Sequence, residues 1–256
     1  MKRMPVLFVG HGSPMNAIED NRFTSEWALL AKRLPRPDVI VSISAHWFTH
    51  GTRVLDAAAP RMIYDMYGFP DALYKVVYDA PGSPHFAGLA KGLLGDKAIT
   101  DNSWGIDHGT WSVLCRMYPK ADIPVFQISV DRDADADAHF QTGQQLRALR
   151  EQGALILGSG NVVHNLMRVN WAMDGGYPWA EEFDSYIKTQ IQNRNPGGVI
   201  HYEQAGECAS LAFTYMDHFA PLLCVLGASD SSDRVSVFND DCVLGSLSMT
   251  GYLFSS

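Results

Sequence analysis

Short runs of apolar, often β-branched residues alternate along this chain with longer amphipathic segments. The short runs predict buried strands, since roughly four to eight apolar residues bounded by turn signals are typical of a strand covered on both faces. The longer segments repeat apolar residues at spacings of three and four, which places them on one face of a helix. Strands are expected at residues 6–10, 39–45, 125–130, 154–158, 235–238 and 247–254. Helices are expected at residues 25–34, 85–94, 111–118, 134–152 and 181–191.

The alternation of strands with helices predicts an α/β fold with a central, mostly parallel or mixed sheet and helices on both faces. No low-complexity tract or proline-rich linker divides the 256 residues, and the glycine and proline clusters at 81–84 and 195–198 are typical of loops inside one domain. With 46% hydrophobic residues, a chain of this length can bury one sizeable core. We therefore expect a single domain over residues 1–256.

Composition and charge exclude several classes of partner. The formal net charge of -8 would repel a phosphate backbone, so nucleic acid is not an expected partner. The four cysteines have no CxxC spacing, which indicates a reduced, cytoplasmic protein without a structural zinc clamp. The apolar run at 6–9 is too short for a signal peptide, and nowhere do roughly 18 apolar residues follow one another as a membrane span requires. We expect no export and no membrane insertion.

Three histidines fall at or beyond the ends of predicted strands. His11 follows the first strand, His46 follows the second in SAHWF, and His164 lies beyond the fourth in LGSGNVVHN. In open α/β sheets the ligand crevice lies outside the carboxyl ends of the strands. A single histidine there is typically a hydrogen-bonded loop residue, but three at equivalent positions favour a site that uses neutral imidazole ligands. The sequence thus predicts a metal site on one rim of the sheet.

The other histidines are less informative by position. His108, in WGIDHGTW, precedes a predicted helix, where the helix N-terminus favours a neutral imidazole that donates a hydrogen bond; a capping turn built on Asp107 explains the spacing equally well. His218 precedes a strongly apolar run and on its own predicts a core histidine. The motifs HExxH and GxSxG are absent, which excludes a helical zinc protease and a serine hydrolase of the common type. The remaining histidines are expected at the surface: His50, His85, His139 and His201.

Six motifs together resemble one known family. They are GHGSPMN (10–16), SAHWF (44–48), GFPDALYKVVYDAPGSP (68–84), WGIDHGTW (104–111), SGNVVHNL (159–166) and LGSLSM (244–249). This order of motifs resembles the DODA-type extradiol aromatic ring-opening dioxygenases, the LigB-like class III group, and most of all its bacterial 4,5-DOPA dioxygenase extradiol members. The resemblance extends from near residue 4 to near residue 250.

The resemblance implies a role for each matching histidine. His11 and His46 match metal ligands, and His218 stands where the third ligand is expected. His164 matches the acid/base histidine and is also a candidate ligand when no substrate is bound, while His108 matches a histidine on the oxygen and substrate side. The wider superfamily has a carboxylate as third ligand, so an all-histidine set is a departure, and it is a familiar zinc environment. One divalent ion is implied, zinc as bound or iron(II) for oxygen chemistry.

By the same resemblance the substrates are O2 and a catechol such as L-DOPA, cleaved at the 4,5 position to a seco-DOPA that leads to betalamic acid. Trp47, Phe48 and Tyr215 could pack on the ring, although core packing is their commoner role. Two alternatives stay open. One is a non-catalytic metal-binding or partner-binding protein, which would not need His164 and His108. The other is a zinc-dependent hydrolase of an amide or ester that uses the same histidines. Its general base would come from Asp107, Asp217, Glu203 or Glu207.

Overall fold

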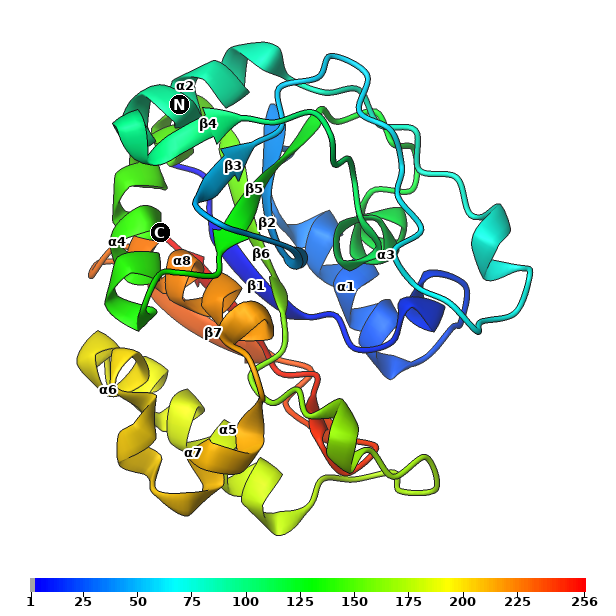
Figure 1. Cartoon of the computed structure of the whole chain (residues 1–256), viewed down its shortest axis with the longest axis vertical. Helices are drawn as coiled ribbons and strands as arrows, with labels where there is room; N and C mark the ends of the chain where they lie inside the picture. The colour runs from blue at the N-terminus through cyan, green and yellow to red at the C-terminus, as the bar shows by residue number, and fades with distance from the viewer. Residues whose placement is uncertain (1–2) are drawn as a thin grey trace.

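The computed structural model describes residues 3–256 and has an eight-stranded mixed sheet at its centre (Figure 1). The strand order is β4-β3-β5-β2-β6-β1-β10-β7. The four central strands β5, β2, β6 and β1 run parallel. At one edge β10 pairs antiparallel with β1, and β7 pairs antiparallel with β10. The strands are β1 (Val6–Gly10), β2 (Val39–Thr49), β3 (Thr52–Val54), β4 (Ala98–Thr100), β5 (Val125–Asp131), β6 (Ala154–Gly160), β7 (Arg234–Phe238) and β10 (Gly251–Ser255). A separate two-stranded ladder joins β8 (Cys242–Val243) to β9 (Leu247–Ser248).

Helices cover both faces of the sheet. On one face lie α1 (Arg22–Arg33) and α3 (His108–Met117), and on the other lie α2 (Pro84–Leu94), α4 (Ala136–Leu146) and α8 (Ala220–Ala228). The hydrophobic core between the sheet and α2, α4 and α8 is extended by α5 (Pro178–Gln192), α6 (Pro196–Ile200) and α7 (Glu207–Ala212). Short 3-10 turns complete the chain: η1 (Pro14–Ala17), η2 (Leu73–Lys75), η3 (Gly95–Lys97), η4 (Arg147–Gln152), η5 (Leu166–Arg168), η6 (Tyr202–Ala205) and η7 (Met216–His218). The predicted α/β fold with a mixed sheet is confirmed.

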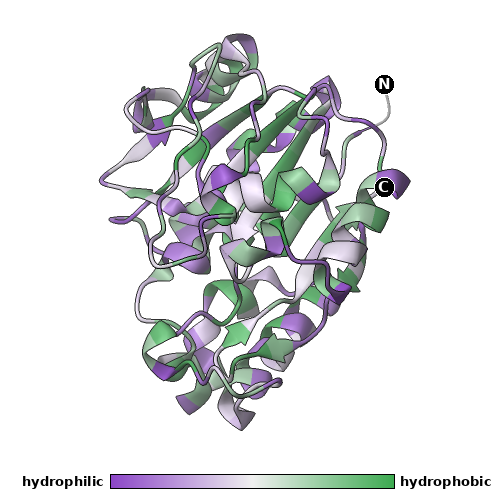
Figure 2. Ribbon diagram, turned by 90° about the vertical axis from the view of Figure 1, so that its right-hand side faces the viewer, coloured by the Kyte–Doolittle hydropathy of each residue, from purple (hydrophilic) through white to green (hydrophobic). Residues whose placement is uncertain are grey.

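The two cores follow from the pleat of the central strands. In β2, Val41 and Ile43 pack into the core under α4 and α8, whereas Ile40 packs into the core under α1 and α3. Successive side chains of a strand point to opposite faces, so a strand buried on both sides needs apolar residues at nearly every position. The central strands accordingly appear largely green in the hydropathy colouring of Figure 2.

Several element boundaries differ from the prediction. Strand β2 continues to Thr49, so His46 lies inside the strand rather than after it; the register with β5 shifts between Ser44 and Phe48, which marks a bulge at that point. The predicted helix at 134–152 ends at Leu146 and continues as 3-10 turns. The expected loop at 195–198 is wrong, because α6 begins at Pro196. The strand expected at 247–254 is two strands, β9 and β10.

Within residues 3–256, no helix combines the length and the apolar character that crossing a bilayer would require.

Candidate metal centre

His11, His46 and His218 meet at the carboxyl ends of the parallel strands. His11 directly follows β1, His46 lies near the end of β2, and His218 ends the turn η7 that leads into α8. Their ring centroids are 5.0 Å (His11 to His46), 5.3 Å (His11 to His218) and 5.1 Å (His46 to His218) apart. Each offers a ring nitrogen within 4.8 Å of the nitrogens offered by the other two. The structure thus brings together three imidazoles that are more than 200 positions apart at the extremes.

Hydrogen bonding defines which nitrogen of His11 is free. Its Nδ1 lies 2.9 Å from Oγ of Ser159, and that hydroxyl donates its own proton to the carbonyl oxygen of Gly109 at 2.5 Å. The hydroxyl therefore accepts a proton from Nδ1, so Nε2 of His11 carries a lone pair. Nε2 of His11 faces Nε2 of His46 at 3.2 Å. A tetrahedral zinc bound by nitrogens at about 2.0–2.1 Å needs them roughly 3.3 Å apart, so this spacing fits two ligands of one ion.

His218 is a buried imidazole whose ring nitrogens make no hydrogen bond within the described part of the chain. Only 5% of the residue is exposed. Nδ1 lies 3.2 Å from Oδ1 of Asp217, but in a direction that does not allow a hydrogen bond, and that oxygen accepts the backbone N–H of His218 at 2.8 Å. Buried polar atoms without partners are rare and costly, and a metal ligand explains this one. The donor set fits a single metal ion.

The cluster is electrically suited to metal binding. Burial lowers the pKa of His11 and of His46 well below the usual value, and repulsion from the neighbouring imidazoles lowers each pKa further. Both rings are therefore neutral near neutral pH, which is the form that binds a metal.

His164 and His108 lie against the three candidate ligands. The ring of His164 stacks on His218 with centroids 3.5 Å apart and planes within 4°. The ring of His108 lies 3.8 Å from that of His46, centroid to centroid. His108 is the first residue of α3 rather than a residue ahead of it, and Asp107 does cap the helix by accepting the N–H of Thr110 at 3.2 Å. The sequence left two alternatives for this segment, a helix cap formed by Asp107 and a functional place for His108. The structure contains both: Asp107 caps the helix, and His108 lies beside the candidate ligands.

One residue of the cluster has no counterpart in the sequence analysis. Oδ2 of Asp65 lies 3.3 Å from Nδ1 of His46, and Oδ1 lies 3.0 Å from Nδ1 of His108. His46, Asp65 and His108 form a second group whose ligand atoms lie within 4.8 Å of one another. Asp65 stands in an irregular stretch between β3 and η2, so no strand end, helix start or catalytic motif pointed to it.

The four carboxylates that the sequence offered as the base of a hydrolase are engaged in other hydrogen bonds or exposed. Asp107 accepts hydrogen bonds from Ser44 Oγ at 2.7 Å, Gln127 Nε2 at 2.7 Å and Trp104 Nε1 at 3.1 Å. Asp217 is occupied by the backbone of His218. Glu203 and Glu207 are exposed, and Glu203 lies 3.7 Å from the exposed His201.

Two glycines allow the chain segments to approach this closely. A Cβ on Gly109 would stand 2.6 Å from Oγ of Ser44 and 2.8 Å from Cδ2 of His46, closer than real Cβ contacts. A Cβ on Gly160 would collide with the carbonyl oxygen of His218. Any side chain at either position would push a histidine away from the centre.

The remaining sequence candidates lie outside the histidine cluster. His50, His85 and His201 are exposed as expected, but His139 is not: it is buried, with 3% exposed, and burial lowers its pKa to about 4. The expectation failed because His139 faces the core side of α4, where an imidazole replaces an apolar residue. Of the candidate ring-packing aromatics, Trp47 and Phe48 belong to the two cores, and Tyr215 is exposed.

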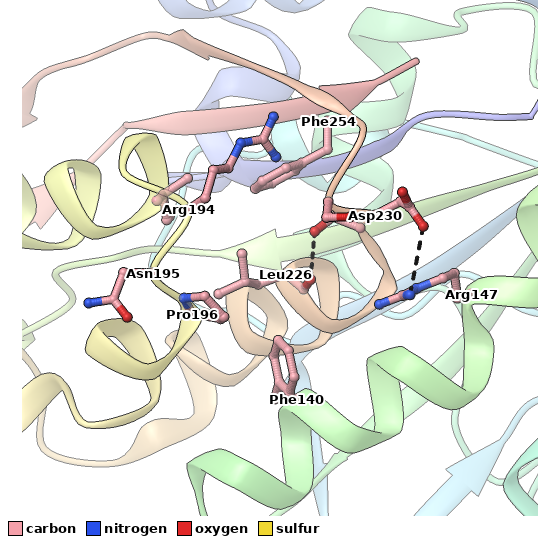
Figure 3. Close-up of a pocket in the computed structure, with 11 residues that line it drawn as sticks. Phe140, Arg147, Arg194, Asn195, Pro196, Leu226, Asp230 and Phe254 are labelled. Carbon is pink, nitrogen blue, oxygen red and sulfur yellow. Dashed lines mark hydrogen bonds and ion pairs between the residues drawn. The ribbon is translucent and has the colours of Figure 1, made fainter.

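The cavities outside the histidine cluster include two that are lined by aromatic side chains. One, of about 250 Å³, is lined by Phe140, Leu226 and Phe254, with Arg147 and Arg194 at its sides (Figure 3). Phe254 pairs with Val6 at the start of β1, so this cavity lies toward the amino ends of the parallel strands, on the opposite rim from His11.

The other cavity, of about 460 Å³, includes Phe48 and Met216 in its lining. Tyr215 lines the same cavity, and Phe48 and Met216 stand two positions from His46 and His218 in the chain.

Comparisons with known proteins agree in pointing to one family. The model of the catalytic LigB subunit of aromatic ring-opening dioxygenase matches residues 5–254. The 4,5-DOPA dioxygenase extradiol of Escherichia coli (strain K12) is 46% identical over 253 residues, which cover 96% of this chain and 93% of that protein. The 4,5-DOPA dioxygenase extradiol of Beta vulgaris is 38% identical, covering 97% and 96%. The crystal structure of an uncharacterized protein from Escherichia coli K12 matches with a TM-score of 0.85 and 41% identity, covering 98% of this chain and 99% of that one.

Proposed function

The chain belongs to the LigB family of aromatic ring-opening dioxygenases, and we propose from this premise that it opens a catechol such as DOPA beside its two hydroxyls, using O2. Relatives from bacteria and plants that carry the name 4,5-DOPA dioxygenase extradiol match it along almost its whole length. It is an extradiol ring-cleaving dioxygenase. The observation that carries the proposed mechanism is the 3.2 Å approach of Nε2 of His11 to Nε2 of His46 beside the unpaired His218.

We propose that His11, His46 and His218 hold one divalent metal ion, with His164 as a fourth ligand when substrate is absent. When bound, iron(II) supplies the electron transfer between catechol and O2 that ring opening requires. Zinc suits the same three imidazoles but cannot change its oxidation state, so we expect a zinc form to bind without turning over.

His164 and His108 would act on the substrate beside this centre. Burial lowers the pKa of His164 well below the usual value, so the ring is neutral and can accept the second phenolic proton of a catechol. The stacking on His218 holds it beside the third ligand. His108 lies against the ring of His46 and would border the catechol.

Family membership disfavours the hydrolase alternative, because the family is one of dioxygenases. Asp107, one of the four candidate bases, also has its carboxylate occupied by hydrogen bonds.

Reconstitution tests the proposed function. Metal-free protein is loaded anaerobically with iron(II) or with zinc, mixed with DOPA, and followed by oxygen uptake and by the absorbance of a ring-opened product. We expect one O2 consumed per catechol with iron(II) and none with zinc. His11→Ala should abolish uptake, whereas His50→Ala, which removes an exposed histidine paired only with Asp133, should not. Failure of iron-loaded protein to consume O2 with DOPA and a panel of other catechols would contradict the proposal.

We further propose that residues 1–256 act as one catalytic domain and that the enzyme works in the cytoplasm. All four cysteines are free, and a reducing compartment keeps thiols in that state.

A further inference from the structure

The segment that carries Asp65 is fastened to the segment that carries His108. The backbone N–H of Ile63 donates to the carbonyl oxygen of Ile106 at 2.8 Å, and the N–H of Ile106 donates to the carbonyl oxygen of Arg61 at 2.8 Å. From inside α3, Nε1 of Trp111 donates to the carbonyl oxygen of Ile63 at 2.9 Å. The position of Asp65 is therefore fixed by the start of α3, although the residue lies in no helix or strand.

The Asp65 carboxylate faces His46 and His108. Oδ1 accepts the backbone N–H of His108 at 2.9 Å, and Oδ2 lies 3.3 Å from Nδ1 of His46. The side chain is 11% exposed, so solvent screens its charge only weakly. Among residues 3–256, no lysine or arginine lies within ion-pair distance of it.

A carboxylate in this place determines how His46 can be used. The 3.3 Å contact between Oδ2 and Nδ1 is an ion-pair distance rather than a hydrogen bond, and a carboxylate this close to Nδ1 attracts a proton there and repels a lone pair, so it favours the tautomer of His46 with the proton on Nδ1. The lone pair is then on Nε2, the nitrogen that faces His11 at 3.2 Å. Carboxylates on the far nitrogen of a metal-bound histidine fix the orientation of the ring and make it a better donor to the metal.

We infer that Asp65 is a positioning residue of this enzyme: it holds His46 with Nε2 toward the metal and keeps His108 beside that ring. The inference rests on the proposed function, because it assigns the metal to His11, His46 and His218. It also decides between the two overlapping groups of candidate ligands. His46 belongs to both groups: its Nε2 faces His11, and its Nδ1 faces Asp65. If Nδ1 carries the proton beside Asp65, only Nε2 can bind the ion, which assigns the metal to the group with His11 and His218.

The test measures metal binding before it measures turnover. Wild type, Asp65→Asn, Asp65→Glu and the control Asp71→Asn, an exposed carboxylate on the same loop, are compared by chelator competition for iron(II) and for cobalt(II). The visible spectrum of the cobalt form reports the geometry around the ion, and thermal melting shows that each variant is folded. Values of kcat and KM for DOPA follow with the iron-loaded proteins.

We expect one ion per chain in every variant. Asp65→Asn should bind it roughly 10–100-fold more weakly, the usual cost of losing such a partner, with a shifted cobalt spectrum and a lower kcat. Asp65→Glu keeps the charge and should recover part of the affinity, and Asp71→Asn should match the wild type. Unchanged affinity and spectrum in Asp65→Asn would overturn the inference, as would two ions per wild-type chain, or a folded Asp65→Asn that binds no ion at all and so identifies Asp65 as a ligand. If metal binding responds as expected but no catechol is opened, the proposed function fails while the role of Asp65 at His46 stands.

Discussion

Two imidazoles at the centre lie parallel and almost in contact, yet they have different surroundings. His218 is 5% exposed and neither of its ring nitrogens has a hydrogen-bond partner among residues 3–256, whereas His164 is only partly buried, and its backbone N–H donates to the carbonyl oxygen of Ala212 at 2.8 Å. The first arrangement suits a ligand, and the second leaves the ring of His164 available to move protons. The roles proposed for the pair follow from this difference.

Replacing His164 should therefore separate metal binding from turnover. His164→Ala is expected to lower kcat about 100-fold or more, because general acid–base catalysis contributes about 10²–10⁴-fold, while iron(II) stays bound through the other three histidines. The measurement is metal content together with oxygen uptake. His85→Ala, at an exposed position of α2, is the matched control and should behave as wild type. Turnover that survives in His164→Ala would show that another group moves the proton.

The sequence indicated individual residues unevenly. His11, His46 and His164 were singled out by their place at or beyond strand ends. His218 follows no strand, and only the family resemblance distinguished it from a core histidine. Asp65 could not be predicted from the sequence, because nothing in its local pattern distinguishes it from other loop carboxylates. Its role depends on His46 and His108, which only tertiary folding places next to it.

At the scale of elements, the meeting of α3 with β2 depends on a residue without a side chain. Gly109 in the first turn of α3 lies so close to Ser44 and His46 that a methyl group at this position would clash with both side chains. Glycine within a helix normally costs about 0.5–1 kcal/mol relative to alanine, so its presence there needs a reason. Close approach of the helix to a metal-centre histidine supplies one.

Two glycine-to-alanine changes should consequently act in opposite directions. Gly88→Ala, on α2 with open space around its Cβ position, should raise the free energy of unfolding by about 0.5–1 kcal/mol. Gly109→Ala should lower it and weaken metal binding, because either α3 or His46 must shift. Denaturant unfolding and chelator competition measure the two effects. A Gly109→Ala protein that binds metal as tightly as wild type would show that the helix can move without disturbing His46.

A buried carboxyl ties α5 to the C-terminal strands. Asp184 is 4% exposed and accepts hydrogen bonds from the hydroxyls of Ser248 at 2.5 Å and Thr250 at 2.9 Å. Burial raises its pKa to about 6 despite these two donors. The folded protein therefore binds the proton more tightly than the unfolded chain, whose pKa for this group is near the ordinary 3.8.

The sign of the pH effect follows from that difference. The contribution of Asp184 to stability is full at low pH and is lost as pH rises from about 4 through about 6, to a total of about 3 kcal/mol. Asp184→Asn cannot ionise, so the difference in unfolding free energy between Asp184→Asn and wild type should move in favour of the variant as pH rises from 4 to 7. Urea unfolding at several pH values measures it. A difference that stays constant over this range would show that the carboxyl titrates normally.

Helices were predicted correctly where apolar and polar residues alternate with a helical period. They were missed where the helix is buried on all sides and has no polar residues to mark that period. All five predicted helices exist, because each has one apolar face. The helix α8 was not predicted, since Ala220–Ala228 is buried on all sides and has no polar face to reveal a helical period. The extension of β2 past Ala45 was missed because the bulge interrupts the alternation there.

For the whole molecule, strand order is what converts scattered histidines into a site. In the sheet, β6 lies between β2 and β1, and all three run parallel, so their carboxyl ends reach the same rim. The turn η7 then brings His218 over that rim, where its carbonyl oxygen accepts the N–H of Asn161 at 2.9 Å. Strand order is not encoded in local pattern, so the sequence predicted a common rim but could not derive which strands are neighbours.

Because the candidate ligands come from β2, from the residue after β1 and from the turn η7 that leads into α8, a bound ion would join the rim of the sheet to the start of a helix that covers one face. Metal that binds only the folded state stabilises it by mass action, about 2.7 kcal/mol at a free concentration 100 times the Kd. Removing the metal with a chelator should therefore lower the melting temperature of the whole domain in a single transition, and adding zinc or iron(II) should restore it. His218→Ala should show a smaller difference in melting temperature with and without metal than the wild type, since it lacks one of the proposed ligands. Calorimetry measures the shift, and a metal-dependent change confined to a separate, partial transition would show that the ion fastens a local segment rather than the sheet.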